Sequence, residues 1–405
     1  MWKVSVSSDI MNTTQMRTPE SIPKGIQGNE SPKEMALKLI ENLSEAFIGR
    51  EEEARLAVIA LSVKGHACFI GEPGTAKSAL FRRLSDAVSG KYYYYLMSKY
   101  TIPDEIIGPI DPIEYRNGKF TRMVAGRMPT ANISFIDEVF KASSETLNTL
   151  LNIMNERSFV DIDGRMFNVP LYSMFSASNE LPESEELQAF FDRILIKHFV
   201  KPVDPSGIEA GIIANINGVK SMSPITLGDI DTLNAAIRNH LVTNADAIAK
   251  TISSMVSVMR QHGIFISDRT AMGPNYLPML VAAHSYIFNS PVKKSAISMS
   301  KYILTNNEDA LTNYSKALDS LYPAELRMAQ EKLEKAFEHA QGGNLGDAKN
   351  AGIEAMAQIQ AAAAKESVVS LYADEIVELT NQAGDFVKKI EALQANLGQF
   401  KKVNA

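Results

Sequence analysis

The sequence predicts a doubly wound α/β domain, a mostly parallel sheet covered by helices, followed by regions made of helices alone. Three observations predict this fold. Between residues 52 and 200, short apolar runs rich in branched and aromatic residues alternate with helical patterns. Such runs are typical of strands buried on both faces of a parallel sheet. A glycine-rich loop follows the first run directly, and only helical patterns remain after residue 204.

The α/β domain is expected to cover residues 31–203. Its first helix begins with Ser31 as the cap and Pro32 at the first helical position, where a missing N–H is tolerated. Residues 1–30, rich in Ser, Thr, Asn, Gly and Pro, are expected to form a loosely ordered extension. The expected strands are His66–Ile70, Tyr92–Met97, Ile133–Ile136, Leu171–Ala177 and Ile194–Val200.

Two hairpins are expected to interrupt this domain. One spans residues 110–123 and turns at Asn117-Gly118; the other spans residues 158–169 and turns at Asp163-Gly164. Both dipeptides suit a type I′ turn, because each tolerates positive φ angles at low cost.

The rest of the chain is expected to be helical. Residues 204–318 form a smaller all-α lid, and residues 319–405 form a helical C-terminal domain. The latter is rich in Ala, Glu, Gln and Lys and is broken at Gly342-Gly343-Asn344. We expect two or three long amphipathic helices there that pack together.

The composition excludes several classes of protein. The chain has 405 residues and a net charge of −6, so no global basic field indicates nucleic-acid binding. Cys68 is the single cysteine, which leaves no disulfide framework within the chain. No apolar stretch reaches the roughly 18 residues of a membrane span, and the first thirty residues lack the apolar core of a signal peptide. The expected location is the reducing cytoplasm.

The strongest chemical signal is the loop Gly71-Glu72-Pro73-Gly74-Thr75-Ala76-Lys77-Ser78, between an expected strand and helix. A phosphate chain needs inward N–H donors, a helix N-terminus, a cation and a hydroxyl for magnesium, and this loop supplies all four. Lys77 would reach the β- and γ-phosphates, and Ser78 would bind Mg²⁺. Glycine is usual where Ala76 stands; alanine there is expected to keep a right-handed backbone. The ordinary alternative is a glycine turn before a helix.

Polar side chains follow two further expected strands. Asp137 and Glu138 end the run Ile133–Ile136 at the sheet edge where open α/β sheets bind ligands. Asp137 can hold Mg²⁺ through water, and Glu138 can orient and deprotonate an attacking water. Asn179 is placed to hydrogen-bond the γ-phosphate or that water. Alone, the carboxylates could be a helix cap and Asn179 a turn residue; the phosphate loop strengthens the functional interpretation.

Beyond these motifs, a run of segments follows the order found in one family. The segments are Tyr95–Ser98, Pro103–Glu105, Ile107–Pro109, Phe135–Glu138, Leu147–Leu151, Asn155–Arg157 and Ser178–Pro182. In this order they resemble the MoxR ATPases of the RavA type, a family of AAA+ proteins, over roughly residues 35 to 300. The helices after residue 320 do not match that family in detail.

The resemblance implies an ATP- and Mg²⁺-dependent ring, expected to be a hexamer, whose two hairpins face the axial pore. It places Arg193 as an arginine finger that reaches a neighbouring subunit's γ-phosphate. It places Arg269 as a sensor that touches the phosphates within its own subunit, and Ile48 and Gly49 beside the adenine. The alternative for each arginine is a surface ion pair, and for Ile48 and Gly49 a structural role.

The expected activity is ATP hydrolysis coupled to chaperone-like remodelling of a protein partner. In the family that partner is often a protein with a von Willebrand factor A (vWA) domain. Two alternatives stay open: a nucleic-acid motor of the same class, disfavoured by the acidic charge, and an ATP-gated assembly scaffold with little turnover.

Overall fold

The computed structural model describes residues 31–161, 163–182, 184–203, 205–217, 225–304, 313–314, 316–317 and 323–403. The expected N-terminal extension lies outside the described residues. The chain divides into two compact units. One takes in the residues up to Ser253 together with Ile266–Asn306, and the other takes in Ser254–Phe265 and the residues from Asn307 onward.

The first unit is built on a five-stranded parallel sheet with strand order β3-β4-β7-β1-β8. The predicted fold class is therefore confirmed, and strand ends differ from the prediction by at most two residues. The strands are β1 (Ala67–Ile70), β3 (Tyr92–Leu96), β4 (Ile133–Asp137), β7 (Ser173–Ser178) and β8 (Ile196–Phe199).

Three helices beside the sheet begin at a serine whose side chain caps them. The first helix, α1, starts with a capping box in which Ser31 and Glu34 exchange hydrogen bonds, as its sequence predicted for the Ser31 cap. Ser143 and Ser184 cap α6 and α7 in the same unit. The helices around the sheet are α1 (Pro32–Ala46), α2 (Glu51–Ser62), α3 (Lys77–Ala87), α4 (Pro103–Ile107), α6 (Ser144–Glu156) and α7 (Glu185–Asp192).

A stack of buried aromatic rings fixes α3 on the sheet. The ring of Phe81 stacks on Phe135 of β4 at 5.1 Å and on Phe175 of β7 at 4.6 Å between centroids. Phe69 of β1 meets the same ring edge-on at 4.9 Å. Such pairs add about 0.5–1.5 kcal/mol each beyond the area they bury. Because α3 follows the glycine-rich loop directly, this stack also fixes that loop against the strand ends.

The prediction of a hairpin over residues 110–123 is wrong in detail. A single antiparallel bridge joins Ile110 to Arg122, and the segment between them contains the helix α5 (Pro112–Arg116). Asp111 caps α5 by accepting hydrogen bonds from the backbone N–H groups of Ile113 and Glu114.

The Asn117-Gly118 pair ends this helix instead of turning a hairpin. The N–H of Lys119 bonds to the carbonyl of Glu114, and that of Gly118 to the carbonyl of Tyr115. With Gly118 at φ 75°, this is the glycine stop common at helix ends. The Asp-Pro start of α5 therefore outweighed the turn signal of Asn-Gly.

The second expected hairpin forms, with a different turn. Strands β5 (Ser158–Val160) and β6 (Met166–Asn168) pair antiparallel. Only Gly164 of the Asp163-Gly164 pair has a positive φ, at 80°, so the turn is not type I′. The Gly164 N–H bonds to the Asp161 carbonyl and the Asp161 N–H to the Arg165 carbonyl, so the loop is longer than a two-residue type I′ loop.

The helical part of the first unit follows α8 (Pro205–Asn217). It contains α9 (Leu227–Thr243), the start of α10 (Ala245–Gln261), α11 (Asp268–Met272), α12 (Leu277–Phe288), α13 (Val292–Ser300) and the 3-10 turn η3 (Lys301–Ile303). The expectation of helices alone needs one correction. The two-residue strand β9 (Ile225–Thr226) pairs with β2 (Val88–Ser89), which extends backbone pairing beyond the sheet.

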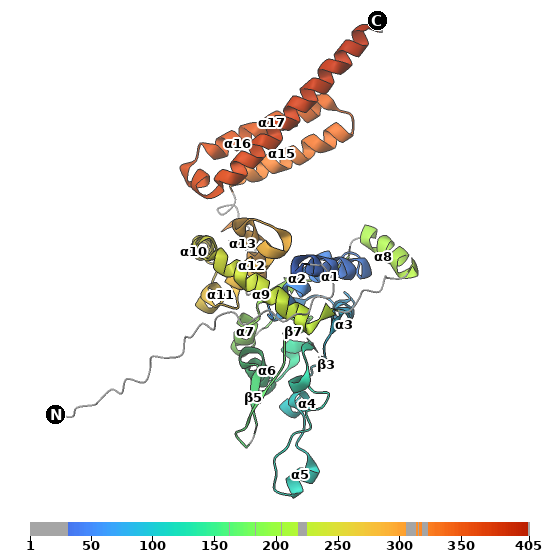
Figure 1. Ribbon diagram of the computed structural model, residues 1–405, viewed down its shortest axis with the longest axis vertical. Helices are drawn as coiled ribbons and strands as arrows, with labels where there is room; N and C mark the ends of the chain where they lie inside the picture. Colours follow the sequence, from blue (N-terminus) through green and yellow to red (C-terminus); the bar gives the residue numbers. More distant parts are fainter. Residues whose placement is uncertain are drawn as a thin grey trace, which may run out of the picture. The chain divides into compact units, whose positions relative to one another are not determined.

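The second unit contains three long helices, α15 (Ala324–Gln341), α16 (Leu345–Ala363) and α17 (Glu366–Val403), as the sequence predicted (Figure 1). The break at Gly342-Gly343-Asn344 separates α15 from α16, and Asn344 caps the second of these helices. Within the described part of the chain, no helix combines the length and apolar character that a membrane crossing needs.

Candidate functional site

The glycine-rich loop runs from the end of β1 to the first turn of α3. Its first glycine lies against the neighbouring strand region: the Gly71 N–H bonds to the Ser178 carbonyl at 3.0 Å. A Cβ at Gly71 would come within 2.5 Å of the Val200 carbonyl oxygen, so only glycine fits there. Gly74 has a φ of 83° and open space around it. The loop is thus held at one end and open at its crest.

Ala76 departs from the expectation of a right-handed backbone. It adopts φ 63° and ψ 16°, the left-handed region, immediately before the first residue of α3. For a residue with a Cβ this conformation costs about 1–2 kcal/mol. The strain explains why glycine is usual at this position, and it locates a strained residue inside the phosphate loop.

The ammonium of Lys77 lies inside the loop. Its Nζ donates to the carbonyls of Gly71 at 2.7 Å and Glu72 at 2.9 Å, and to the Thr75 hydroxyl at 3.1 Å. Burial lowers the pKa of Lys77, an effect that the carboxylates of Asp137 and Glu138 oppose. Carbonyl oxygens are weak partners for a cation compared with phosphate. The ammonium is therefore placed to exchange them for a phosphate chain.

The two predicted magnesium ligands meet at the start of α3. The Ser78 hydroxyl donates to Oδ2 of Asp137, 3.0 Å away. Asp137 ends β4, while Ser78 occupies the second residue of α3. A hydroxyl and a carboxylate oxygen side by side are the hard ligands that Mg²⁺ prefers, so the pair fits this ion.

The predicted base and polar sensor also meet. The side-chain amide of Asn179, which follows β7, donates to Oε1 of Glu138. Glu138 has a φ of 54°, a conformation that turns the chain sharply after β4. Its second oxygen, Oε2, lies 3.4 Å from Nζ of Lys141. Sequence reasoning missed Lys141, although its position three residues after Glu138 on a short helical turn was a usable signal.

The two arginines lie by the end of α7. Arg193 is the C-cap residue of α7 and donates from Nη1 to the Ala189 carbonyl at 2.7 Å. Arg269, on α11, pairs with Asp192 at 3.4 Å. Among the described residues, the contacts recorded for both guanidinium groups therefore go to α7 and not to the phosphate loop.

The segment at Ile48 and Gly49 leads into a buried charged pair. Gly49 has a φ of 76°, and a Cβ there would come within 2.7 Å of Val203. The next residue, Arg50, is 6% exposed and donates to the Lys201 carbonyl at 2.6 Å. Its guanidinium also lies 3.6 Å from Glu53.

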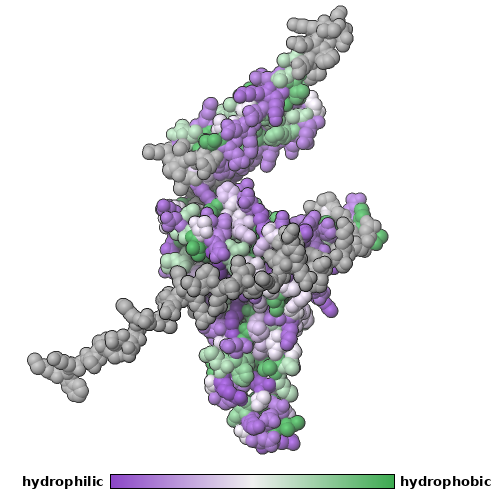
Figure 2. All heavy atoms as spheres, viewed as in Figure 1, coloured by the Kyte–Doolittle hydropathy of each residue, from purple (hydrophilic) through white to green (hydrophobic). Residues whose placement is uncertain are grey.

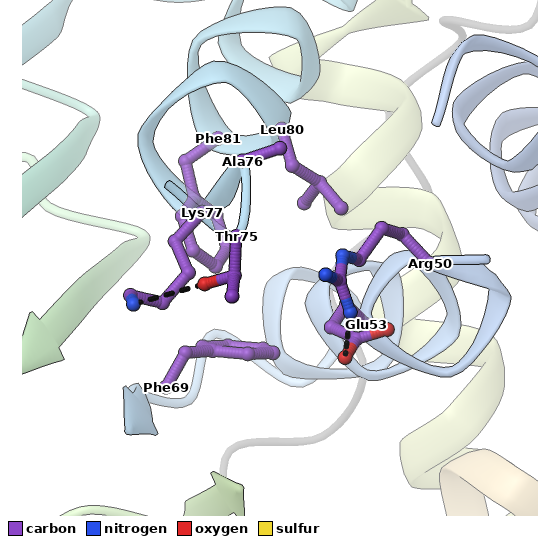
Figure 3. Close-up of a pocket in the computed structure, with 8 residues that line it drawn as sticks. All are labelled: Arg50, Glu53, Phe69, Thr75, Ala76, Lys77, Leu80 and Phe81. Atoms are coloured by element: carbon purple, nitrogen blue, oxygen red, sulfur yellow. Dashed lines mark hydrogen bonds and ion pairs between the residues drawn. The ribbon is translucent and has the colours of Figure 1, made fainter. Parts of the chain in front are cut away.

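Arg50 and Glu53 border a small cavity beside the phosphate loop (Figure 3). Thr75, Ala76 and Lys77 line its other side. Sequence reasoning missed both charged residues. The acidic run directly after Arg50 is typical of an exposed helix start, so the burial of these two residues was not expected.

The chain is similar in sequence and in fold to known proteins. Residues 34–235 match the sequence model of a family described as the MoxR domain in the MoxR-vWA-beta-propeller ternary systems. An uncharacterized protein of Methanocaldococcus jannaschii is 37% identical over 238 residues, which cover 58% of this chain and 62% of the relative. The chaperone MoxR1 of Mycobacterium tuberculosis is 26% identical over 233 residues, which cover 56% of this chain and 60% of the relative.

In both cases the alignment spans less than two thirds of the relative's length. The crystal structure of a candidate ATPase from Cytophaga hutchinsonii is similar in fold, with a TM-score of 0.57 at 17% identity. That likeness covers 72% of this chain and 94% of the other.

The parallel α/β core, together with the match to the MoxR domain, defines the class, the AAA+ ATPases. Through residues 34–235, the chain belongs to the MoxR family of that class.

Proposed function

We propose that this chain hydrolyses ATP with Mg²⁺ and works in a ring of identical subunits, expected to be a hexamer, to remodel a protein partner. The observation that carries the proposal is the meeting of Ser78 with Asp137 beside Lys77. These side chains come from a phosphate loop and a strand end, and together they offer a cation and two magnesium ligands in one place.

The proposed roles follow from the chemistry of each group. Lys77 would leave its loop carbonyls for the β- and γ-phosphates, while Ser78 and Asp137 would hold Mg²⁺. When bound, Mg²⁺ supplies positive charge to the phosphate oxygens. Glu138 would take the proton of the attacking water, and Asn179 would orient Glu138 and contact the γ-phosphate.

Ring formation is proposed because, within the described part of the chain, the Arg193 guanidinium bonds to the Ala189 carbonyl of α7 and not to the loop of its own subunit. A neighbouring copy could place this guanidinium on the γ-phosphate in trans, as the family resemblance implies. Arg269 would act within its own subunit, reaching the phosphates with the guanidinium N–H groups that do not face Asp192. Ile48 and Gly49 would border the adenine.

Remodelling of a partner is proposed from the two inserts, residues 110–123 and 158–169. They expose large apolar side chains, which Figure 2 shows as green patches among purple ones. Contiguous exposed apolar patches mark sites of contact with other proteins, and the proposal takes the apolar side chains of the two inserts as such a site. The matched family is named for systems that include a vWA protein, so a vWA-domain protein is the partner we expect.

Substitution of Lys77 tests the proposed activity. Lys77→Ala should abolish phosphate release and weaken the binding of a fluorescent ATP analogue strongly, while thermal unfolding stays near that of the wild type. Lys119→Ala, at a lysine 70% exposed on an insert, is the matched control and should change neither. Phosphate release by Lys77→Ala at the wild-type rate would overturn the proposal.

Ring formation needs a separate observation. Negative-stain electron microscopy with and without ATP should reveal closed rings whose abundance increases with nucleotide. Single particles of monomer size at all nucleotide and protein concentrations would contradict the ring.

A further inference from the structure

Lys197 is a lysine inside the hydrophobic core. It stands on β8 and is 2% exposed. Lysine is almost never fully buried unless its charge has partners. Here Nζ donates to the carbonyls of Ile194 at 2.8 Å and Ile303 at 3.3 Å, and it lies 5.3 Å from the ring centre of Phe191.

The two carbonyls belong to different parts of the first unit. Ile194 directly follows Arg193, the C-cap residue of α7. Ile303 ends η3, in the helical part of the unit. The ammonium therefore joins the end of α7 to the helical lid.

A second link joins the same two parts. Asp192, the last residue of α7, pairs with Arg269 of α11 at 3.4 Å. Two contacts therefore connect the residues around Arg193 to the lid. Lys197 makes one inside the core, and Asp192 makes the other nearer the surface.

Burying the ammonium of Lys197 costs folding free energy. Burial lowers the pKa of Lys197 to about 8, and the carboxylate of Asp192 opposes this shift only in part. An apolar side chain of similar length would avoid this desolvation, and such replacements are often neutral or stabilising. Packing alone therefore does not explain a lysine at this position.

We propose that Lys197 is a positioning residue that fixes the Arg193 segment to the lid, so that the lid of one subunit sets the position of Arg193 in its neighbour's site. This inference rests on the proposed trans role of Arg193. It extends that role, because it names Lys197 as the residue through which the nucleotide bound to one subunit would affect the position of Arg193 in the next subunit's site.

Lys197→Met tests the inference, because methionine keeps the length and removes the ammonium. Misplacement of a catalytic group by about 1 Å costs up to about 10²-fold in rate. We therefore expect kcat for ATP hydrolysis to fall between about 10- and 10²-fold, with unchanged ATP affinity and no lower temperature of unfolding. The matched control is Lys301→Met, which removes a different lid contact, to Glu52 on α2, and should leave kcat near the wild-type value.

The double variant Lys197→Met with Arg193→Ala separates the two proposals. If Lys197 acts through Arg193, the double variant hydrolyses ATP no more slowly than Arg193→Ala alone. Wild-type kcat in Lys197→Met beside an impaired Arg193→Ala would overturn the role of Lys197. Wild-type kcat in Arg193→Ala would overturn the proposed trans arginine itself.

If Lys197→Met does not fold, Asp192→Asn provides the second test. It breaks the half-exposed link to Arg269 and keeps the side-chain shape. The same selective loss of kcat would support the inference, and a wild-type kcat would overturn it.

Discussion

The hydroxyl of Ser78 donates a hydrogen bond to the carboxylate of Asp137, although 59 positions separate the two residues along the chain. The contact exists because α3 begins and β4 ends at the same edge of the sheet, and the Phe81 stack holds α3 against the sheet. The same edge brings Asn179 to Glu138. Predictions about hydrolysis follow from these two contacts.

Glu138→Gln should separate binding from hydrolysis. Glutamine keeps the shape and the contact with Asn179 but does not accept the proton of water, so turnover should fall by about 10²–10⁴. ATP affinity should stay close to that of the wild type. Asp137→Asn should instead raise the Mg²⁺ concentration needed for half-maximal rate.

Both variants are measured by phosphate release over a magnesium titration. Glu145→Gln, at an exposed glutamate on α6, serves as the control. Wild-type turnover in Glu138→Gln would mean that another group acts as the base.

Ala76→Gly should relieve strain in the phosphate loop. The left-handed backbone costs alanine about 1–2 kcal/mol, whereas glycine adds about 0.5–1 kcal/mol of unfolded-state entropy. The free energy of unfolding should therefore rise slightly, by up to about 1 kcal/mol, with ATP affinity retained or improved. Ala79→Gly, in the regular part of α3, should lower it by about 0.5–1 kcal/mol. Equal losses in both variants, from urea unfolding, would contradict the strained backbone.

The two inserts are joined by a buried ion pair. Arg122, 6% exposed in its side chain, contacts Asp161, 1% exposed, at 2.7 Å. Arg122→Met leaves that carboxylate buried without this cation, which should lower the free energy of unfolding by about 3–5 kcal/mol.

The exposed pair of Asp163 with Arg165 in the same hairpin provides the control. Asp163→Ala should cost no more than about 1 kcal/mol. A similarly small loss of unfolding free energy in Arg122→Met would show that this ion pair does not stabilise the contact between the two inserts.

Acid should destabilise the first unit through His284. Burial lowers the pKa of this imidazole to about 4, helped by Arg55 and Lys294. An unfolded histidine titrates near 6.5, so the unfolded chain binds more protons between about pH 4 and 6.5. Stability therefore falls as the pH drops through that window, by on the order of 3 kcal/mol from this group.

His284→Gln should flatten the pH dependence of unfolding between those limits. His339→Gln, at an exposed histidine of α15, should not change it. An unaltered pH dependence in His284→Gln would contradict the assigned burial effect.

The strands could be predicted from their short apolar runs, and the main site residues from their positions directly after those runs. Buried runs mark parallel strands, and polar residues after such runs must gather at one sheet edge. The backbone of Ala76 could not be predicted, because its φ depends on the path that the loop takes into α3. Asn117-Gly118 favours a hairpin turn, whereas Asp111 favours the start of a helix. The structure contains the helix α5, which Asp111 caps. The burial of Arg50 and Glu53 could not be predicted, because their partners, the Lys201 carbonyl and the His198 ring, lie far along the chain.

The central claim, an ATP site completed by a neighbour, is tested most directly by mixing two inactive variants. Arg193→Ala should lower turnover by about 10³–10⁵, with little change in ATP affinity, and Lys77→Ala should bind ATP only weakly. Mixed rings contain interfaces that pair an intact phosphate loop with an intact Arg193, so phosphate release should partly return on mixing. No recovery in mixtures shown by native mass spectrometry to co-assemble would contradict a trans role for Arg193.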